Sequence, residues 1–129
     1  MIVVDASAAA EWLLDTPKAG AVRARAIRED ALVAPHLIDV EVLQAFRNLT
    51  AAGILDPVRA RDALTDLAEM RMTRYPHFAL LPRIWELRHN LSAYDAAYVA
   101  LAEAMDAPLL TCDRKLSAAS GHRAKIHLI

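Results

Sequence analysis

The stretch Ile2-Val3-Val4-Asp5-Ala6-Ser7 decides the fold class. Three consecutive β-branched residues favour a short buried strand, and this apolar run stops at Asp5. Residues 8–14, which follow closely, have the pattern of a helix. A buried strand that leads into a helix is the usual opening of an α/β fold, so we expect a mostly parallel sheet flanked by helices.

Short apolar runs and helical segments alternate along the rest of the chain. Further strands are expected at residues 31–34, 72–75, 108–111 and 125–128, which gives a sheet of about five short strands. Helices are expected at residues 17–28 with Pro17 in the first turn, 37–52, 57–70, 83–90 and 93–105, and directly after Asp113. Gly53 suits a helix C-terminal cap, and Asp56 followed by Pro57 suits a helix start. These elements predict a single domain over residues 1–129, with helices on both faces of the sheet.

The composition excludes several classes of protein. Hydrophobic residues make up 56% of the 129 residues, which excludes a disordered chain. No apolar run approaches the roughly 18 residues of a membrane span, and the first residues lack the regions of a signal peptide. The only cysteine, Cys112, cannot form an internal disulfide, so we expect a cytoplasmic protein. A net charge of −1 excludes a uniformly basic surface for nucleic acid.

Four acidic residues are candidates for a functional site, although each also has an ordinary structural explanation. Asp5 and Asp113 both follow a predicted strand, where either would also serve as a helix N-cap. Glu41 lies on a helix, where a solvated surface acid is the common case. Asp95 is the acidic member of a capping box that begins at Ser92. Because ligands bind at the carboxyl ends of parallel strands, Asp5 and Asp113 are expected at the same edge of the sheet.

Carboxylates that converge at such an edge imply a bound cation. Two of them 4 Å apart repel by about 4 kcal/mol at an effective dielectric constant near 20, and a protein offsets this repulsion with protons or a cation. A ligand set made only of oxygen selects Mg²⁺ or Mn²⁺ rather than zinc. Mg²⁺ on carboxylates, with positions left for water, is typical of phosphodiester hydrolysis.

Four segments of the chain together resemble PIN domains, and their order and spacing are most similar to the VapC-type ribonuclease toxins of bacterial toxin–antitoxin pairs. The resemblance covers essentially the whole chain. The segments are Val4-Asp5-Ala6-Ser7, Pro35 to Glu41, Tyr94-Asp95-Ala96-Ala97-Tyr98-Val99-Ala100-Leu101-Ala102, and Leu110-Thr111-Cys112-Asp113-Arg114-Lys115-Leu116. The third segment and the Thr111-x-Asp113 pattern are the most specific. The resemblance implies a three-layer PIN-like fold.

By this resemblance the chain would be a Mg²⁺-dependent endoribonuclease, with Mn²⁺ able to substitute, that hydrolyses RNA phosphodiester bonds with a metal-bound water. The family's four acidic positions fall on Asp5, Glu41, Asp95 and Asp113. Asp5 and Asp95 would be the most direct metal ligands, and the other two acids would complete the shell, directly or through water.

Other positions of the chain take supporting roles under the same resemblance. The family's small hydroxyl positions fall on Ser7 and Thr111, which would orient carboxylates or bind a phosphate oxygen. Arg114 and Lys115 would meet the RNA backbone beside Asp113, although solvated charges at a helix start explain them equally well.

The resemblance also implies a VapB-like antitoxin as partner and a homodimer. The high hydrophobic fraction leaves apolar surface available for such association. We expect an apolar groove, walled by Trp12 and Leu13 on one side and by helix 37–52 on the other, that receives an amphipathic helix of the antitoxin. On helix 37–52 the residues expected near the apolar face are Leu37, Val40, Leu43 and Phe46. A cationic antitoxin side chain would then reach the acids; the alternative is that Trp12 belongs to the core.

Three other functions differ in what they require of the sequence. A haloacid-dehalogenase-like phosphatase needs a second aspartate two residues after the first, where this chain has Ser7. A receiver domain needs an aspartate at the end of the third strand, where this chain has Tyr75-Pro76. A PIN scaffold retained only as an RNA- or protein-binding module stays open as the alternative, and the full set of four acids argues against it.

Overall fold

The sheet is built from five short strands that all run in parallel. The computed structural model describes residues 1–129 and contains β1 (Ile2–Val4), β2 (Leu32–Pro35), β3 (Met72–Tyr75), β4 (Leu109–Thr111) and β5 (Ile126–Leu128). Their order across the sheet is β3-β2-β1-β4-β5. The expected α/β fold with about five short strands is confirmed, and the sheet is fully rather than mostly parallel.

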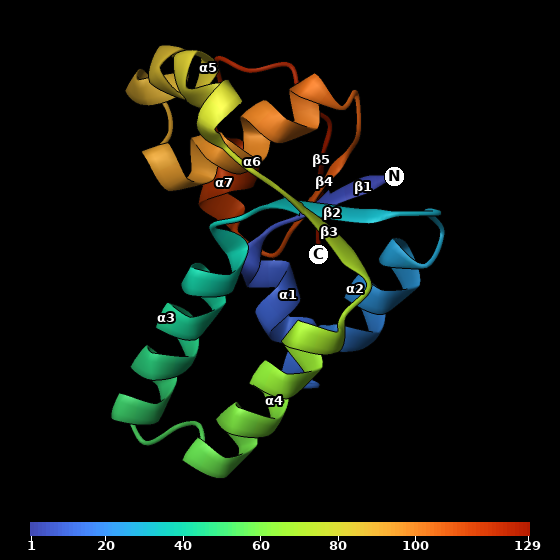
Figure 1. Ribbon diagram of the computed structural model, residues 1–129, viewed down its shortest axis with the longest axis vertical. Helices are drawn as coiled ribbons and strands as arrows, with labels where there is room; N and C mark the ends of the chain where they lie inside the picture. The colour runs from blue at the N-terminus through green and yellow to red at the C-terminus, as the bar shows by residue number, and fades with distance from the viewer.

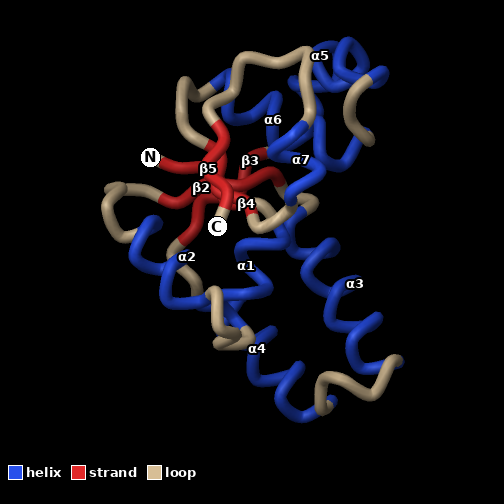
Figure 2. Tube along the Cα trace, turned by 180° about the vertical axis from the view of Figure 1, so that it is seen from behind, coloured by secondary structure: helices blue, strands red, loops and turns tan.

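The helices form a layer on each side of the sheet (Figures 1 and 2). The α-helices are α1 (Ala6–Leu13), α2 (Ala19–Ala26), α3 (Ile38–Ala51), α4 (Pro57–Glu69), α5 (Leu81–Glu86), α6 (Ala93–Ala104) and α7 (Arg114–Ala118), with short 3-10 turns η1 (Phe78–Leu80) and η2 (Leu87–His89) around α5. In both views α5 and α6 lie on one side of the strands and α1, α2 and α4 on the other. None of these helices has both the length and the apolar character that crossing a membrane requires.

The core is centred on β1 and α6. All three residues of β1 are buried, as expected for a middle strand covered on both faces. In α6 every residue from Ala96 to Ala102 is buried. Its small alanines allow the helix to lie close to the sheet. Because the helix is buried on nearly all sides, it is apolar almost all round.

Local sequence signals place most helix ends correctly. The Asp56 side chain accepts a hydrogen bond from the Val58 N–H at 2.7 Å, and Gly53 has a φ of +73°, which suits the left-handed cap that ends α3. Pro17 does not lie in the first turn of α2, contrary to expectation: it precedes the helix, which begins at Ala19 after Lys18.

The helices α3 and α4 form an antiparallel pair that extends away from the sheet (Figure 1). On α3 the buried residues are Ile38, Val42 and Phe46, which are spaced four apart and pack toward α1 and α4. The expected apolar face was therefore wrong in part, because Val40 and Leu43 are 68% and 47% exposed. At about 100° per residue, Val40 is rotated roughly half a turn from Ile38, and Leu43 roughly a quarter of a turn from Val42. Both side chains therefore point away from the core.

Candidate active site

The strand order reverses at β1, and this reversal creates a site. From β1 the chain proceeds outward through β2 and β3, then returns to place β4 on the other side of β1. The carboxyl ends of strands at such a switch point are where α/β proteins bind ligands. Val4 of β1 is paired with Leu110 of β4, so Asp5 and Thr111, the next residue of each strand, become neighbours at this edge.

Asp5 is buried and held from three directions. Its Oδ1 accepts hydrogen bonds from the Ser7 hydroxyl at 2.7 Å and from the Ala8 N–H at 2.9 Å, and its Oδ2 accepts one from the Thr111 hydroxyl at 2.5 Å. The Ala8 bond makes Asp5 the N-cap of α1. The ordinary structural role and a position at the strand edge therefore coexist in one side chain.

The two hydroxyls also connect the ends of β1 and β4. The Ser7 and Thr111 oxygens are 3.3 Å apart, Ser7 Oγ accepts the Cys112 N–H at 2.9 Å, and Thr111 Oγ1 accepts the Asp113 N–H at 2.9 Å. Thr111 is completely buried. Both hydroxyls thus fix the orientation of Asp5 and the path of the chain toward Asp113.

Asp113 and Asp95 enter the same region from helix N-termini. Asp113 is the N-cap of α7 and accepts the Lys115 N–H at 2.7 Å. Asp95 lies in the first turn of α6, where the Ser92 hydroxyl caps the helix by accepting the Asp95 N–H at 3.1 Å. The partial positive charge of a helix N-terminus favours a carboxylate by about 0.3–1 kcal/mol, which helps both positions to carry an acid.

Glu41 reaches the region from the first part of α3. Its Oε2 accepts a hydrogen bond from the Tyr98 hydroxyl at 2.6 Å, and Tyr98 is only 1% exposed. Asp39, two residues earlier, points elsewhere and pairs with Arg74 of β3 at 2.9 Å. The two acids differ because residues two apart on a helix lie on different faces.

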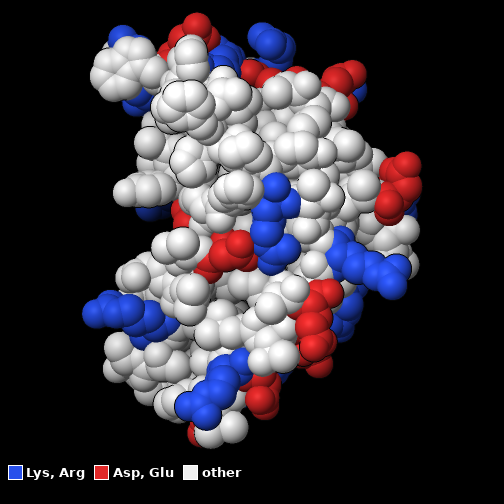
Figure 3. All heavy atoms as spheres, viewed as in Figure 1, with Lys and Arg blue, Asp and Glu red and all other residues white.

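The four acids line one open cleft of about 300 Å³. The remaining lining residues are small or uncharged: Ala6, Ser7, Ala10, Gln44, Ala45 and Tyr98. No lysine, arginine or histidine lines it, so the charges of the acids are not compensated inside the cleft. Figure 3 shows that on the face it presents, acidic and basic side chains are interspersed among larger uncharged areas.

The pKa values of three of these acids respond to this environment. Burial is the largest cause that raises the pKa of Asp5, of Glu41 and of Asp95. Mutual repulsion adds to it, from Asp113 on Asp5 and Asp95, and from Asp95 and Asp5 on Glu41. The Tyr98 hydrogen bond acts in the opposite direction on Glu41. The cleft is therefore a place where protons or a cation would relieve charge.

The donor set of the cleft fits a hard divalent cation. Four carboxylates and no nitrogen or sulfur ligand are the groups that Mg²⁺ and Mn²⁺ prefer. No three acidic, histidine or cysteine side chains are gathered closely enough to form a ready cluster. Asp5, Asp113 and Glu41 are instead each directed by their own hydrogen bonds.

The other residues expected at a functional surface are distributed differently. Arg114 and Lys115 are exposed at the start of α7 and do not line the cleft. Tyr98 and Gln44 do line it. Tyr98 was not among the expected site residues, although its position three residues after Asp95 places the two side chains on one face of α6.

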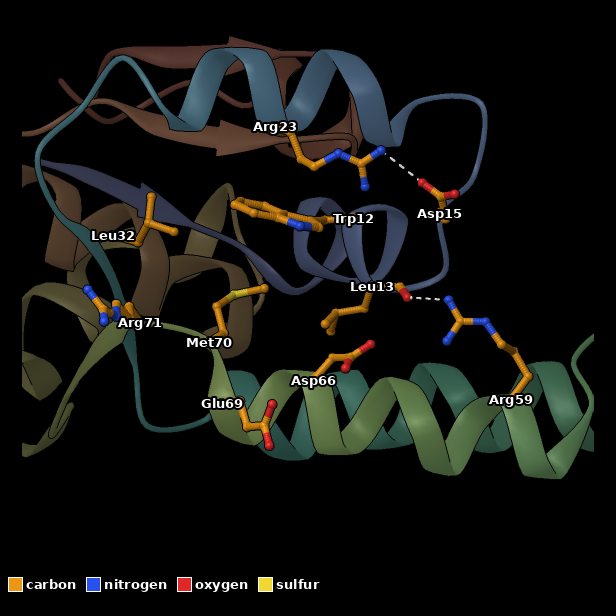
Figure 4. A pocket seen from close by; sticks show the side chains of 10 residues that line it. All are labelled: Trp12, Leu13, Asp15, Arg23, Leu32, Arg59, Asp66, Glu69, Met70 and Arg71. Carbon is orange, nitrogen blue, oxygen red and sulfur yellow. Dashed lines mark hydrogen bonds and ion pairs between the residues drawn. The ribbon is translucent and has the colours of Figure 1, made fainter.

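A second and larger cavity, of about 480 Å³, lies between α1, α2, β2 and the end of α4 (Figure 4). Trp12, Leu13, Leu32 and Met70 supply its apolar lining. Figure 4 shows the Trp12 ring between α2 and the segment that carries Met70. Arg23 pairs with Asp15 at 2.8 Å, and Arg59 donates to the Leu13 carbonyl at 2.8 Å. Asp66, Glu69 and Arg71 complete the lining, so an apolar floor has a charged border.

The expected second wall of the apolar groove was wrong. Neither Leu37 nor Phe46 lines the cavity of Trp12. Phe46 is 2% exposed, and what remains of its surface borders a separate groove between α3 and α4, beside Leu43 and Leu64. The reason is that α3 packs against the side of α1 with its Ile38–Phe46 stripe, whereas α2 and α4 flank Trp12.

Known proteins resemble this chain over nearly its full length. The family model of the PIN domain matches residues 2–121. Ribonuclease VapC9 of Mycobacterium tuberculosis (strain ATCC 25618 / H37Rv) is 46% identical over 117 residues, covering 91% of this chain and 89% of the relative. Ribonuclease VapC1 of the same strain is 41% identical over 128 residues, covering 98% and 96%. The crystal structure of PAE2754 from Pyrobaculum aerophilum superposes with a TM-score of 0.70 at 25% identity, covering 97% of this chain and 81% of that one.

Proposed function

The chain belongs to the PIN domain family, and from this premise we propose that it is a Mg²⁺-dependent endoribonuclease, the toxin of a VapBC-type pair. The relatives named ribonuclease VapC support the reaction class. The observation that carries the proposal is the cleft at the switch point, with four carboxylates and no basic residue. If the four acids were only helix-start residues and surface charges, nothing would require them to line the same cleft.

In this proposal Asp5, Asp95, Glu41 and Asp113 hold the cation, with Mn²⁺ able to replace Mg²⁺. When bound, the ion supplies positive charge to the phosphate and lowers the pKa of water. Ser7 and Thr111 keep Asp5 oriented through their hydrogen bonds to its two oxygens.

The remaining chemical tasks also have candidates among the residues of this chain. Glu41 and Asp95 line the cleft with the other two acids, so a carboxylate oxygen of either that is not bound to the cation could accept a proton from water near the scissile phosphate. Arg114 and Lys115, exposed beside Asp113, contact the flanking phosphates of the RNA. An RNA substrate and one free thiol, Cys112, fit a cytoplasmic protein.

RNA cleavage by purified, antitoxin-free protein tests the proposal. With Mn²⁺ or Mg²⁺ present, the wild type should cleave a labelled single-stranded RNA, and EDTA should stop the cleavage. Asp5→Asn should be inactive, whereas Asp62→Asn, which changes an exposed acid on α4, should retain wild-type activity. Cleavage in EDTA, or full activity of Asp5→Asn, would refute a metal-dependent reaction. If the wild type cuts no RNA under any condition, the result favours the binding-module alternative.

We place the antitoxin in the cavity lined by Trp12. Its apolar floor of Trp12, Leu32 and Met70 matches the apolar stripe of an amphipathic helix, and the charged border gives polar flanking residues partners. An aromatic residue in a partly buried pocket is typical of the positions that contribute most to binding. A cationic residue of the same antitoxin would compete with the cation for the four acids.

We also propose a homodimer. Three large apolar side chains around α5 are strongly exposed: Phe78 at 79%, Leu81 at 47% and Trp85 at 68%. Exposed apolar side chains grouped on one short segment are a common mark of an association surface. Light scattering of the wild type and of Trp85→Ala tests this: a dimer that becomes a monomer on substitution supports it, and a monomeric wild type refutes it.

A further inference from the structure

Tyr98 provides a contact across the cleft that the four acids do not provide by themselves. Its hydroxyl donates to Glu41 Oε2 at 2.6 Å, and this carboxylate is the partner that the structure gives it. The ring is 1% exposed and therefore has one fixed position in the core. A neutral phenol beside a carboxylate has one useful role, as the donor. The short distance is typical of a hydrogen bond to an ionised acceptor.

The contact joins two separate parts of the fold. The helix α3, which carries Glu41, packs on α1 and α4, whereas α6, which carries Tyr98, packs on α5 and the strands. Asp95 is three residues before Tyr98 and lies on the same face of α6. Glu41 is a long side chain, half-buried at the border of an open cleft, and it accepts no other hydrogen bond from the protein. Without the phenol, several rotamers would be open to it.

We propose that Tyr98 is a positioning residue, which holds the Glu41 carboxylate in the orientation that a cation in the cleft requires. The inference rests on the proposed function, because it assumes that Glu41 contributes to holding the cation. Groups that orient a metal-binding carboxylate through a hydrogen bond typically change metal affinity by 10- to 100-fold. Because the Tyr98 hydroxyl donates its proton to Glu41, its effect on a cation would pass through the Glu41 carboxylate.

The test is the binding of Mn²⁺ to the purified protein, followed by electron paramagnetic resonance of the free ion. Tyr98→Phe removes the hydroxyl and keeps the ring. Tyr94→Phe is the matched control, since it makes the same change on the same helix at a side chain that is 65% exposed. Two further variants are Glu41→Gln alone and Glu41→Gln combined with Tyr98→Phe. A last variant, Asp95→Asn, reports whether Mn²⁺ binding uses the cleft at all.

We expect Tyr98→Phe to weaken Mn²⁺ binding by roughly 10-fold and Tyr94→Phe to change it by less than about 2-fold. In the Glu41→Gln background the same Tyr98 substitution should change the affinity by less than about 2-fold, because the carboxylate it orients is gone. A structural role for the phenol would instead weaken binding equally in both backgrounds.

Three results would overturn the inference. One is wild-type affinity in Tyr98→Phe, and another is an equal loss in the Glu41→Gln background. The third is a Tyr98→Phe protein that does not fold, which would assign the hydroxyl to the stability of the domain. If the wild type binds no Mn²⁺, or if Asp95→Asn binds it equally well, the proposed function fails and this inference fails with it. If binding depends on Asp95 but not on Tyr98, the inference alone is wrong.

Discussion

Thr111→Val should destabilise the domain by roughly 3 kcal/mol at neutral pH. Valine has nearly the same shape, so the change isolates the hydroxyl, which is fully buried. The variant loses the 2.5 Å hydrogen bond to Asp5, and a bond to an ionised group contributes about 1.5–3 kcal/mol. It also leaves the Asp113 N–H without its acceptor, at the low end of about 1–3 kcal/mol because this end of the chain is near solvent.

The size of this loss should depend on pH. Burial raises the pKa of Asp5 above its ordinary value of 3.8, and the hydrogen bond from Thr111 opposes that rise. Since the folded-state pKa lies above the unfolded one, the folded protein binds more protons between the two values, and stability falls as the pH rises through this window. Removing the hydroxyl moves the folded pKa higher. The part of the loss that depends on ionisation of Asp5 is therefore absent below the folded pKa of the wild type and is complete only above the still higher folded pKa of the variant.

Urea unfolding of the wild type, Thr111→Val and Thr111→Ser at pH 7.5 and pH 4 measures both effects. Thr111→Ser retains the hydroxyl and should recover most of the loss at pH 7.5. At pH 4 the loss in Thr111→Val should be smaller than at pH 7.5, because the raised pKa favours protonated Asp5 in the folded state and a hydrogen bond to a neutral carboxyl contributes less than one to an ionised group. Equal losses at the two pH values, or a serine variant as unstable as the valine variant, would refute the assignment of the energy to the Asp5 hydrogen bond.

Three further substitutions have expected outcomes. Asp95→Asn should abolish Mn²⁺-dependent RNA cleavage without lowering the melting temperature, since it removes repulsion from Asp113; residual cleavage in an RNA gel assay would contradict this. Trp12→Ala should weaken antitoxin binding at least 30-fold by calorimetry, while the loss of stability stays below the roughly 3–5 kcal/mol of an emptied core tryptophan site. Glu103→Gln, at a side chain 2% exposed that pairs with Arg83 at 2.8 Å, should cost about 2 kcal/mol in urea unfolding at pH 7. Its cost should decrease as the pH falls below 4.5, because the Arg83 hydrogen bond lowers the pKa of Glu103 and the stability it brings is lost on protonation.

The positions of Asp5 and Asp113 could be predicted because they depend on short-range patterns. A β-branched run that ends in an aspartate places that residue at a strand end, and strand ends of a parallel sheet share one edge. The Ser92 cap placed Asp95 in the first turn of α6 for the same kind of reason. In each case two or three neighbouring residues determine where the side chain lies.

The Tyr98–Glu41 contact and the walls of the apolar cavity depend instead on packing between distant elements. Whether α3 turns Phe46 or Leu43 toward the core depends on the angle at which it meets α1, and both faces of that helix contain apolar residues. Tyr98 looks like any buried aromatic residue of an apolar helix until α3 brings a carboxylate within 2.6 Å of it. Periodicity alone contains neither of these angles.

The central position of β1 has a consequence for how the protein is made. The chain leaves the ribosome N-terminus first, at about 5–20 residues per second. Asp5 and Ser7 are then among the first residues to emerge, but Thr111, the second hydroxyl that orients Asp5, is 106 residues further along the chain than Asp5. The edge of β1 that pairs with β4 therefore stays without its partner through most of synthesis, which takes on the order of 10 s. Completion of the acidic cleft is one of the last events of translation, and a nascent or truncated chain that ends before β4 carries an exposed strand edge and no assembled cleft.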